Sequence, residues 1–148
     1  MLVFAFGSLM SPASLRTTSQ AAHIHGRDRL RGYQRKCNAV HKDFPDAAMN
    51  IVPNAAFSVS GVVVEFPQSD IPALYKRETG YEACDVTAAL EQDYTSPVFA
   101  FMAPDALVTE TDYVRRSYLD TCLDGVPDEE REQWLLETVV ECQIRDDL

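Results

Sequence analysis

The chain has 148 residues, 46% of them hydrophobic and 24% charged, and this length suits one domain over residues 1–148 whose core needs no disulfide or metal staple. Its net charge of −10 disfavours binding to nucleic acid or to an anionic membrane, since both need a basic surface. No apolar run approaches the ~18–20 residues of a membrane-spanning helix, and residues 1–10 lack the charged start of a signal peptide.

The first twenty residues predict a strand, a turn and a short helix. Residues 2–6 form an apolar run that ends at Gly7-Ser8, which is typical of a buried strand running into a turn. Residues 10–20 contain Ser11-Pro12, a capping residue followed by a proline suited to the first turn of a helix.

The next segments predict mainly extended structure. Residues 23–40 alternate irregularly and contain two glycines, which indicates bent or bulged strands. Residues 59–66 are rich in valine and predict a strand. Between them, residues 42–57 are interpreted as a loop because of their turn-forming residues, which are Pro45, Asp46, Asn50, Pro53 and Asn54.

The following part of the chain predicts one helix and two strands. Residues 69–79 have polar caps and an early proline, and Gly80 stands where it can end the helix. Residues 81–89 and 97–102 are interpreted as strands. The order of strands and helices favours an α+β fold over alternating βαβ units.

The last forty residues predict two helices. One begins at Thr111 or Asp112 and ends at Gly125. The other begins at Pro127, followed by acidic residues that suit a helix N-terminus. Its apolar stripe could serve the core or a dimer interface, so a monomer and a homodimer are both left open; the stripe consists of Trp134, Leu135, Thr138, Val139 and Cys142.

Glu78 is an unusual residue in the predicted helix. Ile71, Leu74 and Tyr75 occupy positions i, i+3 and i+4 of an apolar stripe, and Glu78 falls at i+7 on the same face. Partial burial and the nearby helix C-terminus both raise the pKa of a carboxyl, which suits it to proton transfer near neutral pH. The alternative is a frayed, solvent-facing residue or an ion-pair partner of an arginine such as Arg77.

The turn after the first strand is a second candidate site. Its glycine and small residues, Gly7-Ser8, can present backbone N–H groups to a carboxylate or a developing oxyanion. The alternative is an ordinary strand-to-helix turn. Ser8 is disfavoured as a nucleophile because the chain has no G-x-S-x-G motif and no convincing Asp–His order.

Three other groups of residues are interpreted as structural. His23 and His25 share one face of a strand and are expected to face solvent, since two ligands do not make a metal site. The four scattered cysteines favour buried thiols in a reducing cytoplasm. A basic stretch could steer anionic substrates, but a solvated strand face that balances the acidic C-terminal helices is the commoner case; it consists of Arg27, Arg29, Arg31, Arg35 and Lys36.

Four segments in a fixed order carry a more specific signal than any one of them alone. They are FAFGSLM at 4–10, SGVVVEF at 60–66, LYKRETGYEACDVTA at 74–88 and SYLDTCLDGVP at 117–127. Together they resemble the gamma-glutamylcyclotransferase-like family over residues 1–127. The resemblance implies a small, mixed, barrel-like β-sheet flanked by helices, with a pocket at the end of the first strand.

The resemblance also implies a reaction and a site. The family releases 5-oxoproline from a γ-glutamyl compound when the substrate's α-amine attacks its own γ-carbonyl. Glu78 would be the general acid and base, and neither a metal nor another cofactor would be needed. The partner would be a small γ-glutamyl molecule, bound by Ala5, Phe6, Gly7, Ser8, Leu9 and Tyr118. Phe6 stands where the family usually has tyrosine, so the alternative is a non-catalytic binding module on the same scaffold.

Overall fold

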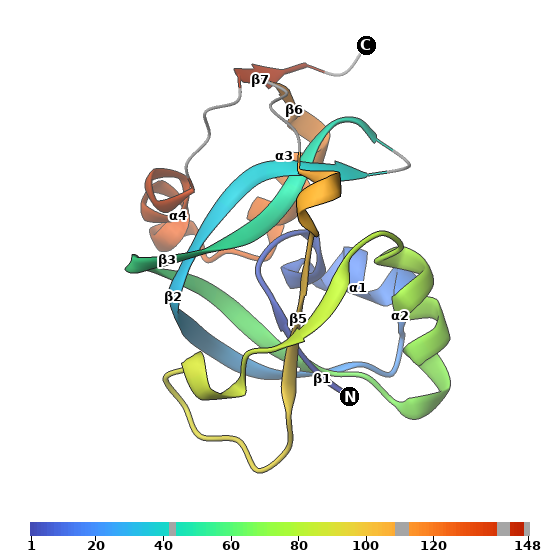
Figure 1. Cartoon of the computed structure of the whole chain (residues 1–148). Helices are drawn as coiled ribbons and strands as arrows, with labels where there is room; N and C mark the ends of the chain where they lie inside the picture. Colours follow the sequence, from blue (N-terminus) through green and yellow to red (C-terminus); the bar gives the residue numbers. More distant parts are fainter. Residues whose placement is uncertain (42–43, 109–112, 139–142, 147–148) are drawn as a thin grey trace.

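A five-stranded mixed sheet forms the centre of the computed structural model of the chain (Figure 1). The structure describes residues 1–41, 44–108, 113–138 and 143–146. The strand order is β2-β3-β1-β5-β4, with bounds His23–His41, Phe44–Glu65, Leu2–Ala5, Val98–Met102 and Glu82–Asp85. Only the β1–β5 pair is parallel among these strands. The predicted α+β class is confirmed, although within the described residues the sheet stays open rather than closing as a barrel.

The predicted first strand, β1, lies in the middle of the sheet. It is antiparallel to β3, where Phe4 faces Val63, and parallel to β5, where Leu2 faces Val98. Val3, Phe4 and Ala5 are all buried. A strand covered on both faces needs a continuous apolar run, which explains the composition of this segment.

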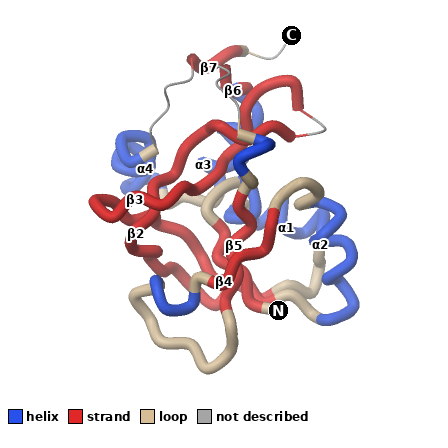
Figure 2. The backbone as a smooth tube through the Cα atoms, viewed as in Figure 1, coloured by secondary structure: helices blue, strands red, loops and turns tan. Residues whose placement is uncertain are grey.

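The prediction of a loop over residues 42–57 is wrong for the described part, because β3 begins at Phe44 and pairs with β2 along a long, bent hairpin (Figure 2). Its polar residues find partners within the fold. The Asn50 amide donates to the Asn38 side chain and accepts from the Ala103 amide. Asp46 forms an ion pair with Arg145 at 2.8 Å. Turn-forming residues are thus accommodated in a strand whose register shifts at several bulges.

Two helices, α1 (Pro12–Thr18) and α2 (Ile71–Arg77), lie side by side (Figure 1). Ser11 caps α1, and its hydroxyl accepts a hydrogen bond from the Ser14 amide, as predicted. α2 ends before Glu78, and Gly80 takes a positive φ of 96°, so the expected glycine stop is confirmed. Short 3-10 turns precede or follow several elements; they are η1 (Ser8–Met10), η2 (Gln68–Asp70), η3 (Thr87–Ala89), η4 (Asp105–Leu107) and η5 (Asp128–Glu130).

The C-terminal part differs from prediction at several points. The helix expected from Thr111 or Asp112 is α3 (Arg116–Asp124); it follows strand β6 (Tyr113–Arg115), and residues 109–112 lie outside the described residues. β6 pairs with β7 (Gln143–Arg145) in a separate small sheet. The last helix, α4, is only Arg131–Glu137. No described helix is long and apolar enough to cross a bilayer.

The predicted stripe on the last helix is only partly correct. Trp134 and Thr138 are buried within the chain, which places the tryptophan in the core, whereas Leu135 is exposed. Val139 and Cys142 lie outside the described residues. The predicted strand over residues 81–89 is limited to β4, and its end forms η3.

Candidate active site

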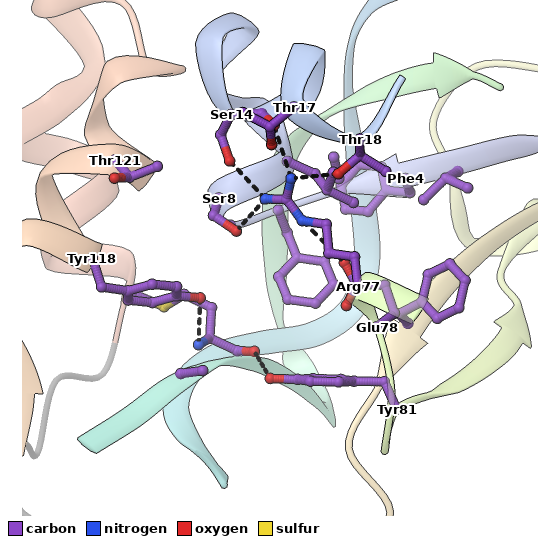
Figure 3. A pocket seen from close by; sticks show the side chains of 18 of the residues that line it. Phe4, Ser8, Ser14, Thr17, Thr18, Arg77, Glu78, Tyr81, Tyr118 and Thr121 are labelled. Carbon is purple, nitrogen blue, oxygen red and sulfur yellow. Dashed lines mark hydrogen bonds and ion pairs between the residues drawn. The ribbon is translucent and has the colours of Figure 1, made fainter. Parts of the chain in front are cut away.

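A cavity of about 440 Å³ lies where β1 ends, between α1, α2 and α3 (Figure 3). This volume is within the usual range of small-molecule sites. The cavity brings together all seven residues assigned to the site from the sequence, which are Ala5, Phe6, Gly7, Ser8, Leu9, Glu78 and Tyr118. Their roles remain predictions, but all seven residues line the same cavity.

The turn after β1 forms one wall of the cavity. The Met10 amide donates to the Gly7 carbonyl at 3.0 Å, and the Ser11 amide donates to the Ser8 carbonyl at 3.2 Å. Gly7 is tightly packed, since a Cβ there would lie 3.1 Å from the Cβ of Met49. Within the described part of the chain, no group accepts a hydrogen bond from the Gly7 amide. The turn therefore leaves this donor available to a ligand.

Glu78 follows the last residue of α2 and lies inside the cavity wall. Only 15% of its side chain is exposed, and burial raises its pKa from the usual 4.5 to about 7. The opposing effect comes from Arg77, whose Nε lies 3.9 Å from Oε1 of Glu78. The expected partial burial near the helix end is confirmed. The expected inward position of Tyr75 is wrong: this residue is 48% exposed, with its ring edge-on to Phe101.

Arg77 joins three elements of the site (Figure 3). Its Nη2 donates to the Ser8 hydroxyl at 2.9 Å and to the Ser14 hydroxyl at 2.7 Å. Its Nη1 donates to the Ser14 carbonyl at 2.9 Å and to the Thr18 hydroxyl at 3.0 Å. The Ser8 oxygen accepts from Arg77, so its own hydroxyl hydrogen can be donated to a ligand.

Two tyrosines fix the wall that β3 contributes. The Met49 amide donates to the Tyr118 hydroxyl at 2.9 Å, and the Tyr81 hydroxyl donates to the Met49 carbonyl at 3.2 Å (Figure 3). Burial raises the pKa of both tyrosines, so they are neutral near pH 7. Tyr118 thus positions a backbone segment as well as lining the cavity.

A comparison of the sequence with family profiles shows which family the chain belongs to. The profile of the family described as "Gamma-glutamyl cyclotransferase, AIG2-like" matches residues 3–120. The chain belongs to this family. No curated protein sequence matches the chain.

Solved structures show the same fold as this member of the γ-glutamyl cyclotransferase, AIG2-like family. A structure named γ-glutamyl cyclotransferase aligns with a TM-score of 0.73 and 17% identity, over 90% of this chain and 85% of that one. An uncharacterized protein from Homo sapiens aligns with a TM-score of 0.76 and 15% identity, over 99% and 90%. YkqA from Bacillus subtilis aligns with a TM-score of 0.72 and 20% identity, over 92% of this chain but 53% of YkqA.

Several cavity residues of this family member were missed from the sequence. Ser14, Thr18 and Tyr81 were not assigned to the site, and Arg77 was considered only as an ion-pair partner of Glu78. The spacing of Ser14 and Thr18 by four residues, on one face of a predicted helix, was a usable signal. Their common partner, Arg77, comes from a distant segment and could not be identified from local pattern.

The remaining sequence candidates lie elsewhere. His23 and His25 are exposed, with ring centroids 4.9 Å apart, as expected. No histidine lines the cavity within the described residues, so a serine nucleophile at Ser8 has no support. Two of the basic residues pair with the acidic C-terminal region, in agreement with the charge-balancing interpretation: Arg27 contacts Glu130 at 2.9 Å and Arg29 contacts Glu137 at 3.5 Å.

Proposed function

We propose that the protein is a γ-glutamyl cyclotransferase that releases 5-oxoproline from a γ-glutamyl amino acid, peptide or amine. The observation that carries this proposal is the carboxyl of Glu78, whose pKa of about 7 lets it exchange protons near neutral pH beside the Gly7-Ser8 turn. Family membership supports the reaction class, and the cavity supports the size of the substrate.

The charges of the cavity match an α-amino acid group. Arg77 and Glu78 are the two charged side chains among its described lining residues, and they are neighbours in the chain. A γ-glutamyl compound carries an ammonium and a carboxylate on one carbon atom. Glu78 is suited to hold the ammonium, while the guanidinium of Arg77 and the hydroxyl of Ser8 provide a favourable environment for the carboxylate.

The reaction needs proton transfer and a fixed substrate conformation. The α-nitrogen forms a bond to the γ-carbonyl carbon, and the bond from this carbon to the leaving nitrogen breaks. Two protons pass in turn from the α-nitrogen to the leaving nitrogen, with Glu78 as the carrier. No water is consumed, because the nucleophile is the substrate's own amine. An α-amine with a pKa near 8 is mostly protonated at pH 7, which makes this transfer necessary.

The turn and the shape of the cavity supply the remaining stabilisation. In the proposed reaction the Gly7 amide, on a residue that lines the cavity, donates to the oxygen of the γ-carbonyl as negative charge develops on it. Intramolecular attack in a well-oriented conformation contributes about 7–11 kcal/mol to lowering the barrier. In this proposal Glu78 carries the protons, Arg77 and Ser8 hold the substrate carboxylate, and the Gly7 amide stabilises the oxyanion.

The test is product formation from a matched set of substrates. We expect 5-oxoproline, measured by mass spectrometry, from one or more of γ-glutamyl-alanine, γ-glutamyl-lysine amide and glutathione. N-acetyl-γ-glutamyl-alanine, which lacks a free amine, and α-glutamyl-alanine, which has the wrong linkage, should release none. Thermal stabilisation by these compounds without any product would instead favour the binding-module alternative that Phe6 raises.

The activity is expected to depend on the ionisation of Glu78. The raised pKa means that kcat/KM should increase with pH up to about 7 and level off above it, because only the ionised carboxylate accepts a proton. The rise of kcat with pH should occur at lower pH than the rise of kcat/KM, because the bound substrate ammonium favours the ionised form of Glu78. Initial rates of 5-oxoproline release between pH 5 and 8 measure both, and a flat profile would exclude Glu78 as the base.

A further inference from the structure

Arg35 is a buried charged residue that the proposed reaction does not use directly. It lies on β2, and its exposed fraction is 1%. The solvated basic face predicted for residues 27–36 is therefore wrong at Arg35. Its Nε donates to the Phe6 carbonyl at 3.0 Å, and its Nη2 donates to the Ser60 carbonyl. Among the described residues no carboxylate lies within ion-pair distance of it, although the charge of Glu137 favours its ionised form. A cation buried in this way is costly unless hydrogen bonds compensate it.

The last helix encloses the guanidinium from the other side. The Arg35 guanidinium carbon lies 4.4 Å from the centre of the Trp134 ring, and Nη1 donates to the Thr138 hydroxyl at 3.2 Å. Thr138 in turn donates to the Trp134 carbonyl at 2.7 Å. Burial lowers the pKa of Arg35 to about 9, so the group remains charged at neutral pH. The guanidinium is therefore a fixed positive charge directly behind the turn.

The contact with Phe6 determines the direction of the next amide. A trans peptide is planar, and its C=O and N–H bonds point in opposite directions. Because the Phe6 carbonyl points to Arg35, the Gly7 N–H must point away from it, and Gly7 lines the cavity. A charged donor on the carbonyl also polarises the peptide and strengthens its N–H as a donor.

We propose that Arg35 is a positioning residue, which holds the Phe6–Gly7 peptide so that the Gly7 amide donates into the cavity. Its effect on catalysis rests on the proposed function, whereas its effect on the amide does not. Arginine suits this position because its planar fork reaches Phe6, Ser60 and Thr138 together, which a lysine ammonium cannot do.

The kinetic test compares Arg35→Met with Arg31→Met, a matched control on the same strand whose guanidinium donates to the distant Leu90 carbonyl. Loss of an oriented oxyanion donor acts on the transition state, so Arg35→Met should lower kcat at least about ten-fold with little change in KM. Arg31→Met should keep the activity of the unmodified chain. An equal kcat for both variants would overturn the catalytic part of the proposal.

The spectroscopic test does not need activity. Protein labelled with 15N-glycine gives signals from six glycines, and Gly7→Ala identifies that of Gly7. Titration with 5-oxoproline should shift the Gly7 amide signal in the unmodified chain and in Arg31→Met, but not in Arg35→Met. If the unmodified chain neither forms nor binds 5-oxoproline, the proposed function fails, while the position of the Gly7 amide signal in the ligand-free Arg35 variants still decides the role of Arg35.

Arg35→Lys covers the case in which Arg35→Met does not fold. It keeps the positive charge but not the planar guanidinium that bonds to the Phe6 carbonyl. The Gly7 amide signal should therefore be displaced in the ligand-free protein, and it should not respond to 5-oxoproline. A Gly7 signal that is unchanged and still responds in the folded Arg35 variants would overturn the proposal. Such a result would show that the peptide is held without the guanidinium.

Discussion

Replacing Glu78 with glutamine is expected to lower kcat for 5-oxoproline release by about 10²–10⁴-fold, the usual contribution of a positioned general base. Glutamine has nearly the same shape as glutamate and cannot accept the ammonium proton. The neighbouring Arg77 keeps its bonds to Ser8 and Ser14, so the turn should stay in place. Mass-spectrometric rates of Glu78→Gln and the unmodified chain measure the effect.

A matched control and a stability measurement separate catalysis from folding. Glu82→Gln removes an exposed carboxyl four residues further on and should leave the rate unchanged. The raised pKa of Glu78 means that the folded chain keeps a proton that the unfolded chain has released above pH 4.5. The unmodified chain should therefore lose about 3 kcal/mol of stability between pH 4.5 and 8 from this group, a loss that Glu78→Gln avoids. Equal rates for Glu78→Gln and the unmodified chain would remove the basis of the proposed mechanism.

Gly61→Ala is expected to destabilise the fold by about 3 kcal/mol or more, because β3 approaches β1 too closely there for a side chain. A Cβ on Gly61 would lie 2.3 Å from the Ala5 carbonyl oxygen and 2.6 Å from the Phe4 ring. Relief of this clash requires the central strand to move, and with it the turn that follows. Thermal unfolding should show a fall in Tm of roughly 10 °C for this loss of stability in a chain of this size.

The control for this substitution is Gly32→Ala. No atom lies within 4 Å of a Cβ on Gly32, and its φ of +81° adds only the strain of a left-handed alanine. That strain is about 1–2 kcal/mol, so Gly32→Ala should unfold at a clearly higher temperature than Gly61→Ala. If the two variants unfolded together, close packing of β3 on β1 would not be the cause.

The parts of the fold that could be predicted are those in which local signals agree. Residues 2–6 are uniformly apolar and end in a glycine turn, and they form the central strand and the turn of the cavity. Glu78, directly after the end of α2, is indeed withdrawn from solvent, because the helical period continued by one residue places it on the same side as Ile71 and Leu74.

The parts that could not be predicted depend on partners distant in the chain. Prolines and asparagines favour a loop by local pattern, but this segment pairs with β2, and there the Asn50 side chain bonds to Asn38 and Ala103. Arg35 looked like one more surface charge, because its acceptors, the carbonyls of Phe6 and Ser60, are backbone groups with no sequence signature. Residue type alone does not reveal which cation a sheet will enclose.

The packing of α4 on Arg35 links the C-terminal helix to the turn after β1. This helix lies beyond residue 120, where the match to the family profile ends. Trp134 on α4 and Thr138, which follows this helix, nevertheless contact Arg35, although neither lines the cavity. If Arg35 orients the Phe6–Gly7 peptide as proposed, substitutions at Trp134 or Thr138 should change turnover without altering a residue that lines the cavity.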